Sequence, residues 1–408
     1  MPIPEKLQPA NPADFPQTIS RFSTVSYMNW RANLIKFCNV AGLPVLEPFV
    51  RLCFGEDPKT QLAGIAKFLL VPVAAVLVFL GAWSVASSVI KTDSLELPSP
   101  SATWAAGTEL FEMHRASKAA RSAKQQEKLQ EAVLSMAKAK KADLLAAEAT
   151  DAEQKSSYEA LALSYRKQAV SAANFKATSA PTFVEQIFTS LKTVFFGFLV
   201  ATLIAVPLGV LCGMSPWCNA ALNPFIQIFK PVSPLAWLPL AFLVIVWAYS
   251  GVSPESIFLD DVLNIPTAQV KAFLISAITV SLCSLWPTLV NTTLGVASVD
   301  KDYLNVAEVL QLSWSQRLFK IILPASLPLM FAGLRISLGV GWMVLIAADM
   351  LAQNPGLGKF VWDEFQNGSS MTYARIAFSV LIIGLIGLAL DRVMICLRNM
   401  VSFGNSPA

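Results

Sequence analysis

The sequence predicts an all-α membrane protein with about six transmembrane helices, and three observations support this fold class. Soluble domains carry roughly 25% charged residues, whereas this chain of 408 residues is 14% charged and 54% hydrophobic. A spanning helix needs about 20 mostly apolar residues, and six windows of the sequence meet this requirement. A polar stretch between Gly107 and Pro181 contains no Gly or Pro and is rich in the helix formers Ala, Lys, Glu and Gln.

These patterns divide the chain into five parts. We expect a cytoplasmic N-terminal region over 1–63, a first transmembrane helix over 64–91, a periplasmic segment over 92–182, a core of five transmembrane helices over 183–400, and a cytoplasmic tail over 401–408. The stretch from Trp30 to Phe54 mixes apolar and basic residues, which favours an interfacial helix before the first span. A partly disordered tail is the alternative for residues 1–20. The N-terminus lacks the pattern of a cleaved signal peptide.

The six predicted spans cover 65–90, 190–213, 222–249, 270–294, 326–352 and 373–396. Prolines interrupt them, including Pro207, Pro231, Pro234 and Pro287. In lipid, the backbone groups freed by a proline must be satisfied by neighbouring helices or by a water-lined path. The spans therefore indicate a transport bundle rather than simple anchors.

The basic residues of the short loops predict the orientation of the chain. Cytoplasmic loops carry an excess of Lys and Arg, and with the N-terminus inside they contain Arg51, Lys59, Lys301, Arg317, Lys320, Arg392 and Arg398. The short outer loops carry Glu255, Asp260 and Asp261, and Lys359 with Asp363 and Glu364. We expect a multi-pass protein of a bacterial inner membrane with both termini and loop 300–324 in the cytoplasm.

The polar stretch 108–180 predicts a periplasmic helical hairpin over about 108–176. Apolar residues fall at helical spacing in two groups, which are Leu129, Val133 and Met136, and then Tyr158, Leu161 and Tyr165. Thr150 or Asp151 offers an N-cap for the second helix. We expect a separable module, removable over about 112–176; a solvated spacer without a role is the alternative.

Catalysis and nucleic-acid binding find little support in the sequence. The net charge is only +4, and the six cysteines have no paired spacing that would indicate a zinc site or a disulfide framework. The single histidine, His114, is expected to be a solvated surface residue. No phosphate-binding loop of the Gly-x-x-x-x-Gly-Lys-Ser/Thr type occurs, so any use of ATP requires a partner.

The segment Asn305–Pro324 carries the most specific motif. It is a charged, water-compatible helical stretch between two apolar spans and ends in Ile-Ile-Leu-Pro. It resembles the cytoplasmic coupling loop of ABC-importer permeases, whose pattern is Glu-Ala-Ala, then Gly, then Ile-x-Leu-Pro. The pattern's Glu falls on Asn305 and its Gly on Gln311. The residues that the resemblance assigns to ATPase coupling are Asn305, Ala307, Leu310, Gln311, Arg317, Leu318, Lys320 and Pro324, with Leu310 and Leu318 as apolar contacts.

Further motifs extend the resemblance over roughly 64–106 and 183–400. They include Ser190-Leu-Lys-Thr-Val-Phe-Phe-Gly-Phe, Pro231-Val-Ser-Pro-Leu-Ala-Trp-Leu-Pro and Gly356-Leu-Gly-Lys-Phe-Val-Trp-Asp-Glu-Phe-Gln-Asn. The last is similar to the nitrate/bicarbonate/cyanate branch of the family. The resemblance implies a type I importer fold and a dimer of two permease copies in the lipid bilayer. It also implies cytoplasmic ABC ATPase subunits, which bind ATP and Mg, and a periplasmic anion-binding protein; this chain itself is expected to bind no cofactor.

Polar residues inside the spans are the candidate substrate path, because such groups usually face a wet cavity or the bundle interior. We assign to the path Lys230, Ser233, Asn291, Thr292, Arg335 and Ser337. Arg335 has an alternative role, in which it pairs with an acidic or carbonyl group and locks the helix packing. Asp349 would repel an anion, so a gating or structural ion pair is expected there. Asp391 is expected to be an interfacial anchor.

The function predicted from these features is that of a non-catalytic permease subunit, driven by ATP, that imports a small inorganic anion, with nitrate as the first candidate and nitrite as a further one. Bicarbonate, cyanate and taurine or alkanesulfonates remain open as substrates. A stand-alone secondary anion transporter or channel is the alternative from another class, and it predicts inverted repeats around broken helices. A structural membrane anchor is a third, against which the prolines and polar groups of the spans argue.

Overall fold

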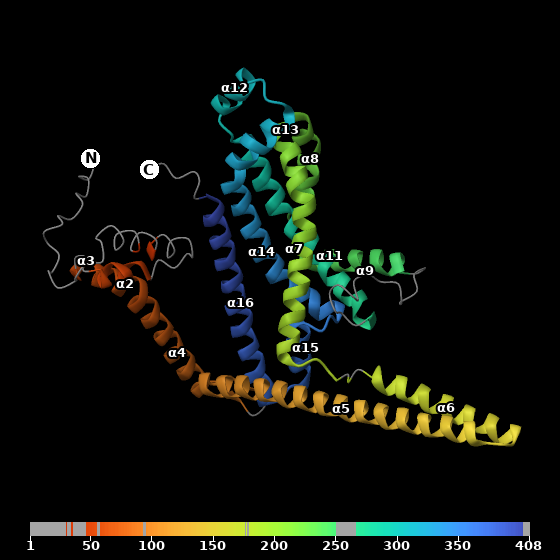
Figure 1. The fold of residues 1–408 in the computed structure, drawn as a ribbon. Coiled ribbons are helices and arrows are strands. Elements are labelled where there is room, and N and C mark those ends of the chain that lie inside the picture. The colour runs from red at the N-terminus through yellow and green to blue at the C-terminus, as the bar shows by residue number, and fades with distance from the viewer. Residues whose placement is uncertain are drawn as a thin grey trace, which may run out of the picture. The chain divides into compact units, whose positions relative to one another are not determined.

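A computed structural model describes residues 30, 34–35, 46–54, 58–92, 95–175, 177, 179–249 and 267–402. The described chain is almost entirely helical, which confirms the predicted fold class (Figure 1). The one departure is a pair of two-residue antiparallel strands, β1 (Lys91–Thr92) and β2 (Leu95–Glu96). The acidic loop residues 255, 260 and 261, and most of the predicted N-terminal region and tail, lie outside the described residues.

The chain forms two compact units, 1–81 with 392–408 and 82–391, so the boundaries fall inside two long helices. The first unit contains α2 (Leu46–Cys53), α3 (Pro58–Ile65), the π-helix η2 (Ala66–Leu70) and the beginning of α4 (Val71–Val89). In α2, Arg51 and Glu47 form an ion pair one helical turn apart, at 2.6 Å. Helix α2 lies within the predicted interfacial region.

Five of the predicted spans are confirmed as long apolar helices: Thr60–Val89, Phe183–Met214, Gln269–Ala297, Trp314–Ala352 and Met371–Val401. The sixth predicted span, over 222–249, is present as two apolar helices with a break at the prolines that the sequence places within it. Helices α8 (Pro216–Phe229) and α9 (Pro234–Tyr249) meet at a bend of 105°. Pro231 and Pro234 lie at the break, and each lacks the N–H group that would continue the helix.

The bundle core consists of α7 (Phe183–Met214), α11 (Thr267–Ala297) and α14 (Leu323–Ala352). Glycines of α7 lie close to α11 at a constant offset of 83 residues: Gly197 against Val280, Gly209 against Thr292 and Gly213 against Val296. The constant offset shows that α7 and α11 run parallel. Helix α14 is antiparallel to both, since Gly341 lies against Ser284 whereas Gly295 lies against Ser326. Small residues allow this close approach in a membrane, where van der Waals packing drives helix association.

The parallel arrangement determines how often the chain crosses. Helices α7 and α11 run parallel, so both begin at the same face of the bundle. The chain between Met214 and Gln269 must therefore return across the bundle once. Helices α8 and α9 are the described apolar part of that return. Counted as one broken span, they bring the number of candidate spans among the described residues to six.

The predicted hairpin is present, with its turn where the sequence placed it. Its arms are unequal: α5 (Pro100–Glu148) has 49 residues and α6 (Ala152–Ala173) has 22. Asp151 caps α6, its side chain accepting from the Glu153 N–H at 3.3 Å. At about 1.5 Å per residue, α5 is about 74 Å long, and it begins at Pro100, before the predicted start of the hairpin at about 108.

Small residues form the packing face of the hairpin. Small residues are buried between the arms, namely Ala132, Ser135, Ala139, Ala142 and Ala146 of α5 and Ala162, Ala169 and Ala172 of α6. We call these residues the alanine seam. The larger apolar residues Leu129, Val133, Met136 and Leu161, whose spacing predicted the two helices, are exposed. Alanines let two helix backbones approach closely, so the larger side chains point outward.

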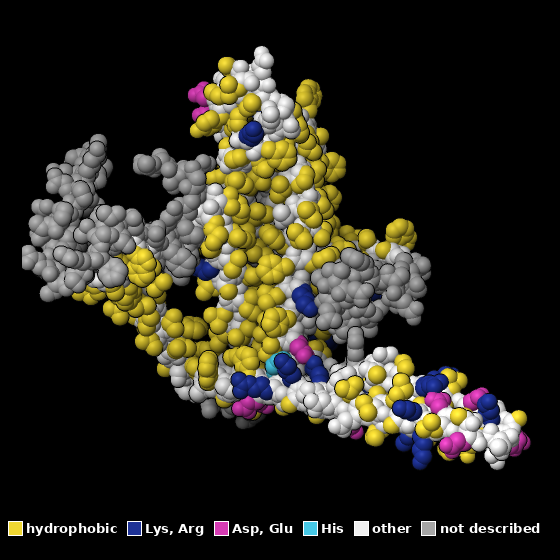
Figure 2. All heavy atoms as spheres, viewed as in Figure 1, with side chains coloured by type: hydrophobic (Ala, Val, Ile, Leu, Met, Phe, Trp, Pro, Cys, Tyr) yellow, Lys and Arg dark blue, Asp and Glu magenta, His cyan; other side chains and the backbone are white. Residues whose placement is uncertain are grey.

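Two opposite ends of the bundle carry the remaining elements (Figure 1). The loop end has α12 (Lys301–Val309), α13 (Trp314–Arg317) and the π-helix η4 (Leu318–Ile322). The hairpin end has the beginning of α7, the N-terminal part of α5, and α15 (Leu357–Asn367), which precedes α16 (Ser370–Ser402). Figure 2 shows a mostly hydrophobic surface along the bundle, with many charged side chains on the hairpin.

Candidate functional sites

The loop end contains the predicted coupling segment, folded as two short helices joined by a tight turn. After α12, the N–H of Leu312 donates to the Ala307 carbonyl at 3.0 Å, and the N–H of Gln311 donates to the Glu308 carbonyl at 3.0 Å. This pair of bonds is the Schellman motif, in which the residue after the C-cap adopts a left-handed conformation and is usually Gly. Gln311 occupies that position with φ of +50°.

The second helix of the loop has its own start and end signals. Ser313 and Gln316 form a capping box, in which each side chain bonds the other residue's backbone N–H. The chain then passes through η4 into α14, and the N–H of Leu323 donates to the Leu318 carbonyl. Pro324 follows and has no N–H to offer the preceding turn, which accounts for the wider helical turn there.

An apolar surface covers the tip of this loop. Its members are large side chains from α12, the turn and α13, which we call the loop-tip surface: Tyr303, Val306, Val309, Leu310 and Trp314. Val309 is 83% exposed and Leu310 is 63% exposed. Contiguous exposed apolar side chains mark an interaction site more often than solvated surface does. Of the predicted coupling residues, Asn305, Leu310, Gln311 and Lys320 are exposed here.

Three other predicted coupling residues face the bundle instead. Ala307 is 1% exposed, so a bulky substitution there would disturb the loop before it met a partner. Leu318 packs on the cluster of Val210, Val296 and Ile322, and its predicted role as an outward contact is wrong. Arg317 is half-buried, and its Nε has no hydrogen-bond partner among the described residues.

The six residues assigned to the substrate path do not converge in the described structure. Ser337 is buried, donates to the Ser284 carbonyl at 2.5 Å and bonds the Thr288 hydroxyl at 2.7 Å. Asn291 donates to the Pro287 carbonyl of its own helix, and Thr292 packs on Gly209. Lys230 and Ser233 are exposed at the α8–α9 bend. The contacts of Ser337 and Thr292 join neighbouring helices, and the path assignment remains a hypothesis.

Arg335 forms a bidentate ion pair with Asp391. Its Nε donates to Asp391 Oδ1 at 2.5 Å and its Nη2 to Oδ2 at 2.9 Å, which joins α14 to α16 within two spans. Asp391 is therefore a partner of Arg335 in helix packing, and its expected place as an interfacial anchor stays a prediction. Bidentate guanidinium–carboxylate pairs are strong and directional, and the geometry favours the alternative role for Arg335, that of locking helix packing.

Asp349 lies at the centre of a buried polar cluster at the hairpin end. Its carboxylate accepts from the Ser190 hydroxyl at 2.8 Å and from the Asn354 amide at 2.7 Å. Ser190 in turn accepts from the Leu357 N–H at 2.8 Å, and Asn354 also donates to Thr193 at 3.1 Å. The cluster ties α7 and α14 to the start of α15. It contains no basic partner among the described residues, so the expected ion pair is replaced by hydrogen bonds from neutral donors.

Two glycines make this cluster possible. A Cβ on Gly356 would overlap the Asp349 carboxylate, and one on Gly358 would overlap the Ile346 carbonyl of α14. The loop before α15 can cross the end of α14 at this distance only without side chains at these positions. This gives a steric reason for the Gly-Leu-Gly of the motif that begins at Gly356.

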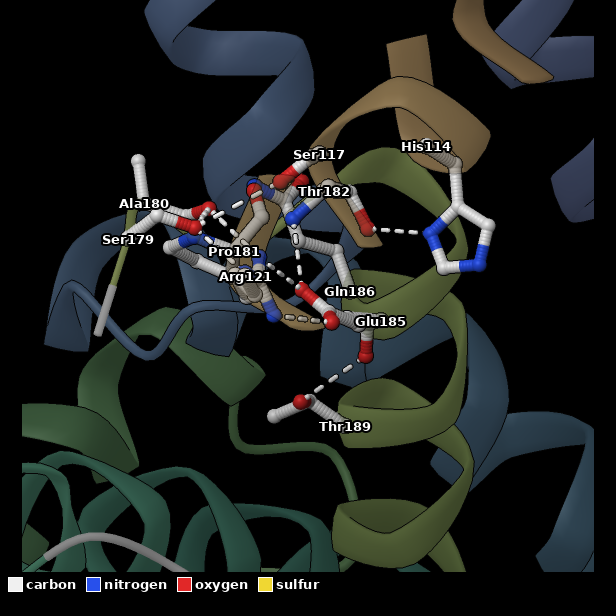
Figure 3. A network of polar contacts seen from close by, with 10 residues as sticks. All are labelled: His114, Ser117, Arg121, Ser179, Ala180, Pro181, Thr182, Glu185, Gln186 and Thr189. Atoms are coloured by element: carbon white, nitrogen blue, oxygen red, sulfur yellow. Dashed lines mark hydrogen bonds and ion pairs between the residues drawn. The ribbon is translucent and has the colours of Figure 1, made fainter. Parts of the chain in front are cut away.

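The hairpin is fastened to the beginning of α7 by a second polar network (Figure 3). Arg121 donates to both carboxylate oxygens of Glu185, at 2.5 and 2.9 Å, and to the Ser179 hydroxyl at 2.5 Å. The bond to Glu185 raises the pKa of Arg121. His114 Nδ1 lies 2.7 Å from the Thr182 hydroxyl, so the prediction of a solvated histidine is wrong.

The base of α5 is also part of the bundle. Arg375 of α16 bonds Glu109 at 2.9 Å and Glu364 at 3.4 Å, and a Cβ on Gly107 would overlap the Phe378 ring. The predicted module over 112–176 therefore begins too early, since it includes His114 and Arg121. Only the part of the hairpin beyond about residue 128 is free of these contacts.

Sequence reasoning missed the partners in all three polar sites. Ser190 and Gly356 each begin a motif that carried the family resemblance. The motifs marked these residues, but they did not indicate that the residues meet at Asp349. Glu185 stands three residues after Thr182 and completes a capping box. Nothing in the sequence indicated that Arg121, 64 residues away, would reach that carboxylate.

Comparisons with known proteins agree with the motifs. Residues 205–401 match the family described as "Binding-protein-dependent transport system inner membrane component". The chain is 36% identical over 216 residues to the nitrate import permease protein NrtB of Synechocystis sp., covering 53% of this chain and 69% of that protein. It is 35% identical over 217 residues to the bicarbonate transport system permease protein CmpB of Synechococcus elongatus, covering 53% of this chain and 68% of that protein.

A comparison with solved structures finds the MetNI methionine ABC transporter in inward-facing conformations. The sequence identity is 17% and the TM-score is 0.37, over 52% of this chain and 94% of that one.

Proposed function

We propose, because the chain belongs to the family of binding-protein-dependent transport system inner membrane components, that it is the permease of an ATP-driven nitrate importer. ABC permease subunits of this family are non-catalytic, and ATP hydrolysis belongs to separate subunits. The proposal adds the substrate, nitrate with nitrite, and import from the periplasm to the cytoplasm. Two copies of the chain would form the complex with ATPase subunits and an anion-binding protein.

The observation that carries the proposal is the loop-tip surface. Five large apolar side chains stand exposed on a short two-helix loop at one end of the bundle. Burial of such side chains in a partner is favourable, and aromatic residues such as Tyr303 and Trp314 are typical of binding hot spots. In an ABC permease, the partner at this end would be the ATPase. The loop end would then be the cytoplasmic end, in agreement with the orientation expected from basic residues.

The similarity to known relatives gives only a weak preference for nitrate over bicarbonate as the substrate. The relatives named for nitrate and for bicarbonate match at 36% and 35% identity over equal shares of this chain. The resemblance of the segment from Gly356 to Asn367 does not separate them either, since it covers the whole nitrate/bicarbonate/cyanate branch. Bicarbonate therefore stands as the second candidate, with cyanate and alkanesulfonates behind it.

The test is purification of the tagged chain from its own membranes in mild detergent, followed by reconstitution with the proteins that co-purify. We expect an ABC ATPase in the complex and nitrate uptake that needs ATP and the anion-binding protein. Competition by unlabelled bicarbonate separates the two candidates: a bicarbonate importer would lose nitrate uptake at low bicarbonate concentration.

The same preparation tests the alternative from another class. Liposomes containing the chain without an ATPase should show no anion flux, with or without ATP. Substrate-dependent flux through the isolated chain would overturn the importer proposal and favour a secondary transporter or a channel.

A further inference from the structure

Two cysteine side chains meet at the corner where α7 ends and α8 begins. The Sγ atoms of Cys212 and Cys218 lie 3.9 Å apart, and both thiols are free. A disulfide places its sulfurs about 2.05 Å apart, so these two atoms are in van der Waals contact without a bond. The sequence did not indicate this pair, because Cys212 belongs to the last turn of one helix and Cys218 to the first turn of the next.

The local backbone brings the two thiols together. Ser215 ends α7, its N–H donating to the Leu211 carbonyl at 3.0 Å, and it also caps α8, its side chain accepting from the Cys218 N–H at 3.3 Å. Pro216 follows as the first residue of α8, a position that needs no N–H. The chain therefore changes from one helix to the next within a single residue, and the two cysteine side chains meet across it.

The two thiols differ in their access to solvent. Cys212 is 2% exposed, whereas Cys218 is only partly buried. A small oxidant therefore reaches the sulfur of Cys218 first, and the sulfur of Cys212 lies directly beside it. An accessible cysteine next to a second, resolving cysteine is the usual arrangement of a redox-sensing pair. The corner thus has the two parts that such a pair requires.

The same corner packs on the base of loop 300–324. Val210 of α7 is buried in one cluster with Ile322 of η4, and Met214 and Leu318 pack against that cluster. The last turns of α7 and the start of the chain's return into α14 therefore share one small apolar core. A covalent bond across the corner would restrain the end of α7 on which the loop rests.

We propose that Cys212 and Cys218 are the site of a reversible disulfide, formed by peroxide, that restrains the corner between α7 and α8. This oxidation goes beyond the proposed transport function, and only its effect on transport rests on that function. Under the proposed function the loop end is cytoplasmic, a compartment in which disulfides are usually transient and redox-sensing.

The oxidation takes place in two steps. The Cys218 thiolate attacks one oxygen of hydrogen peroxide, so an S–O bond forms, the O–O bond breaks and hydroxide leaves, which gives a sulfenic acid. The Cys212 sulfur then attacks the Cys218 sulfur, so an S–S bond forms, the S–O bond breaks, and the hydroxyl group leaves as water with the Cys212 proton. In total the two thiols lose two electrons and two protons, and one peroxide becomes two water molecules. A small thiol reverses the reaction by exchange.

Thiol alkylation of the full-length chain in membranes tests the bond. After treatment with hydrogen peroxide, the chain is denatured and alkylated, and its peptides are identified by mass spectrometry. We expect Cys212 and Cys218 to be protected from alkylation and joined within one chain, and dithiothreitol to restore both thiols. Cys283→Ser is the matched control, because it removes a buried thiol of α11 and should leave the disulfide unchanged.

Two single variants separate the roles of the thiols. In Cys212→Ser, dimedone should trap Cys218 as a sulfenic acid, because the resolving thiol is missing. In Cys218→Ser, Cys212 should stay reduced, because it is buried. The wild-type chain carries the main test, so its outcome does not depend on the folding of a variant. Full alkylation of both cysteines in the oxidised wild-type chain, or a disulfide with another cysteine or another chain, would overturn the proposal.

ATP-dependent uptake by the reconstituted complex shows whether the bond restrains the corner. Peroxide should lower uptake severalfold in the wild type, dithiothreitol should restore it, and Cys218→Ser should keep its uptake. Unchanged uptake with the disulfide fully formed, or an equal loss in Cys218→Ser, would overturn the restraint. Absence of uptake in the reduced complex would instead count against the proposed transport function, while alkylation would still decide the disulfide. The two inferences therefore fail in distinguishable ways.

Discussion

The two ends of the bundle are built on opposite principles. At the hairpin end, charged and polar side chains are paired within the chain: Asp349 with Ser190 and Asn354, and Arg121 with Glu185. At the loop end, large apolar side chains of α12 and α13 are left exposed. The hairpin end is thus held together by buried polar contacts within the chain, whereas the loop end presents an exposed apolar surface at its tip.

This difference has a consequence for mutations. Substitutions at the hairpin end should change the stability of the chain, because they remove buried bonds or insert atoms where none fit. Substitutions on the loop-tip surface should change association with a partner and leave stability nearly unaltered.

Gly358→Ala should be the most damaging change. The new Cβ would overlap the Ile346 backbone carbonyl, and a backbone atom cannot move aside as a flexible side chain can. Over-packing commonly costs about 1–3 kcal/mol, and we expect at least about 3 kcal/mol here. Thermal unfolding in mild detergent measures the loss. Gly384→Ala is the control, because no atom lies within 4 Å of its Cβ position; equal stability of the two variants would refute the close packing of α15 on α14.

Two deletions locate the boundary between the bundle and the free hairpin. Removing 112–176 with a flexible linker takes away His114 and Arg121, so we expect a loss of about 2 kcal/mol or more from the charged hydrogen bonds alone. Removing 132–170 instead keeps those anchors and should leave the bundle stable. Detergent unfolding and yield of folded protein compare the two. Similar stability after both cuts would mean that the network around Arg121 contributes little.

The ion pair between Arg335 and Asp391 tests whether a polar contact within the spans is structural. Arg335→Gln removes the charge and should lower stability by about 1.5–3 kcal/mol, because a bidentate charged hydrogen bond is lost. Adding Asp391→Asn should recover part of that loss, since both charges are then absent. If stability were unchanged in Arg335→Gln while nitrate uptake fell, the packing-lock interpretation would give way to the substrate-path role.

Association through the loop end is tested by Val309→Asp and Leu310→Asp. Both side chains are highly exposed, so the substitutions remove no packing within the chain and should shift the unfolding temperature little. A charge in an apolar contact should weaken binding of a co-purifying ATPase at least tenfold, or roughly 1.4 kcal/mol. Ser315→Asp is a polar control on the same loop. Undiminished ATPase binding by both variants would remove the loop-tip surface from the interface.

Features that depend on residues close together in the chain could be predicted from the sequence, whereas contacts between distant residues could not. Five spans, the break at Pro231 and Pro234, and the hairpin turn before Asp151 follow from hydropathy and from local backbone chemistry. The local sequence does not show that Ala139 rather than Met136 is buried between the two arms of the hairpin. Both residues suit a helix, and only the position of the second arm determines which of them is buried. Pairings such as Arg121 with Glu185 join residues far apart in the chain, and no local pattern encodes them.

The candidate sites divide in the same way. The loop was identified by a short motif whose turn residue, Gln311, adopts the left-handed conformation that the family's Gly would favour. The substrate path was inferred from polar residue types alone, and such residues serve helix packing equally well. Ser337 illustrates this, since its hydroxyl bonds a neighbouring helix rather than an open cavity.

The smallest expected effect is a gain, and it lies at the loop end. Gln311 has φ of +50° in a Schellman turn, a conformation that costs a residue with a Cβ about 1 kcal/mol but costs Gly little. Gln311→Gly should therefore stabilise the turn by about 0.5–1 kcal/mol, less the entropy that Gly adds to the unfolded chain.

Gln353, the other described non-glycine residue with positive φ, ends α14 at the hairpin end. Its Nε2 donates to the Met350 carbonyl at 2.8 Å and its Oε1 accepts from Lys359 at 2.7 Å. Gln353→Gly removes those bonds while relieving the same backbone strain, so it should be neutral or destabilising. Opposite signs for the two substitutions in detergent unfolding would sharpen the contrast between the ends, and a gain in both would show that backbone strain outweighs the local bonds at the hairpin end.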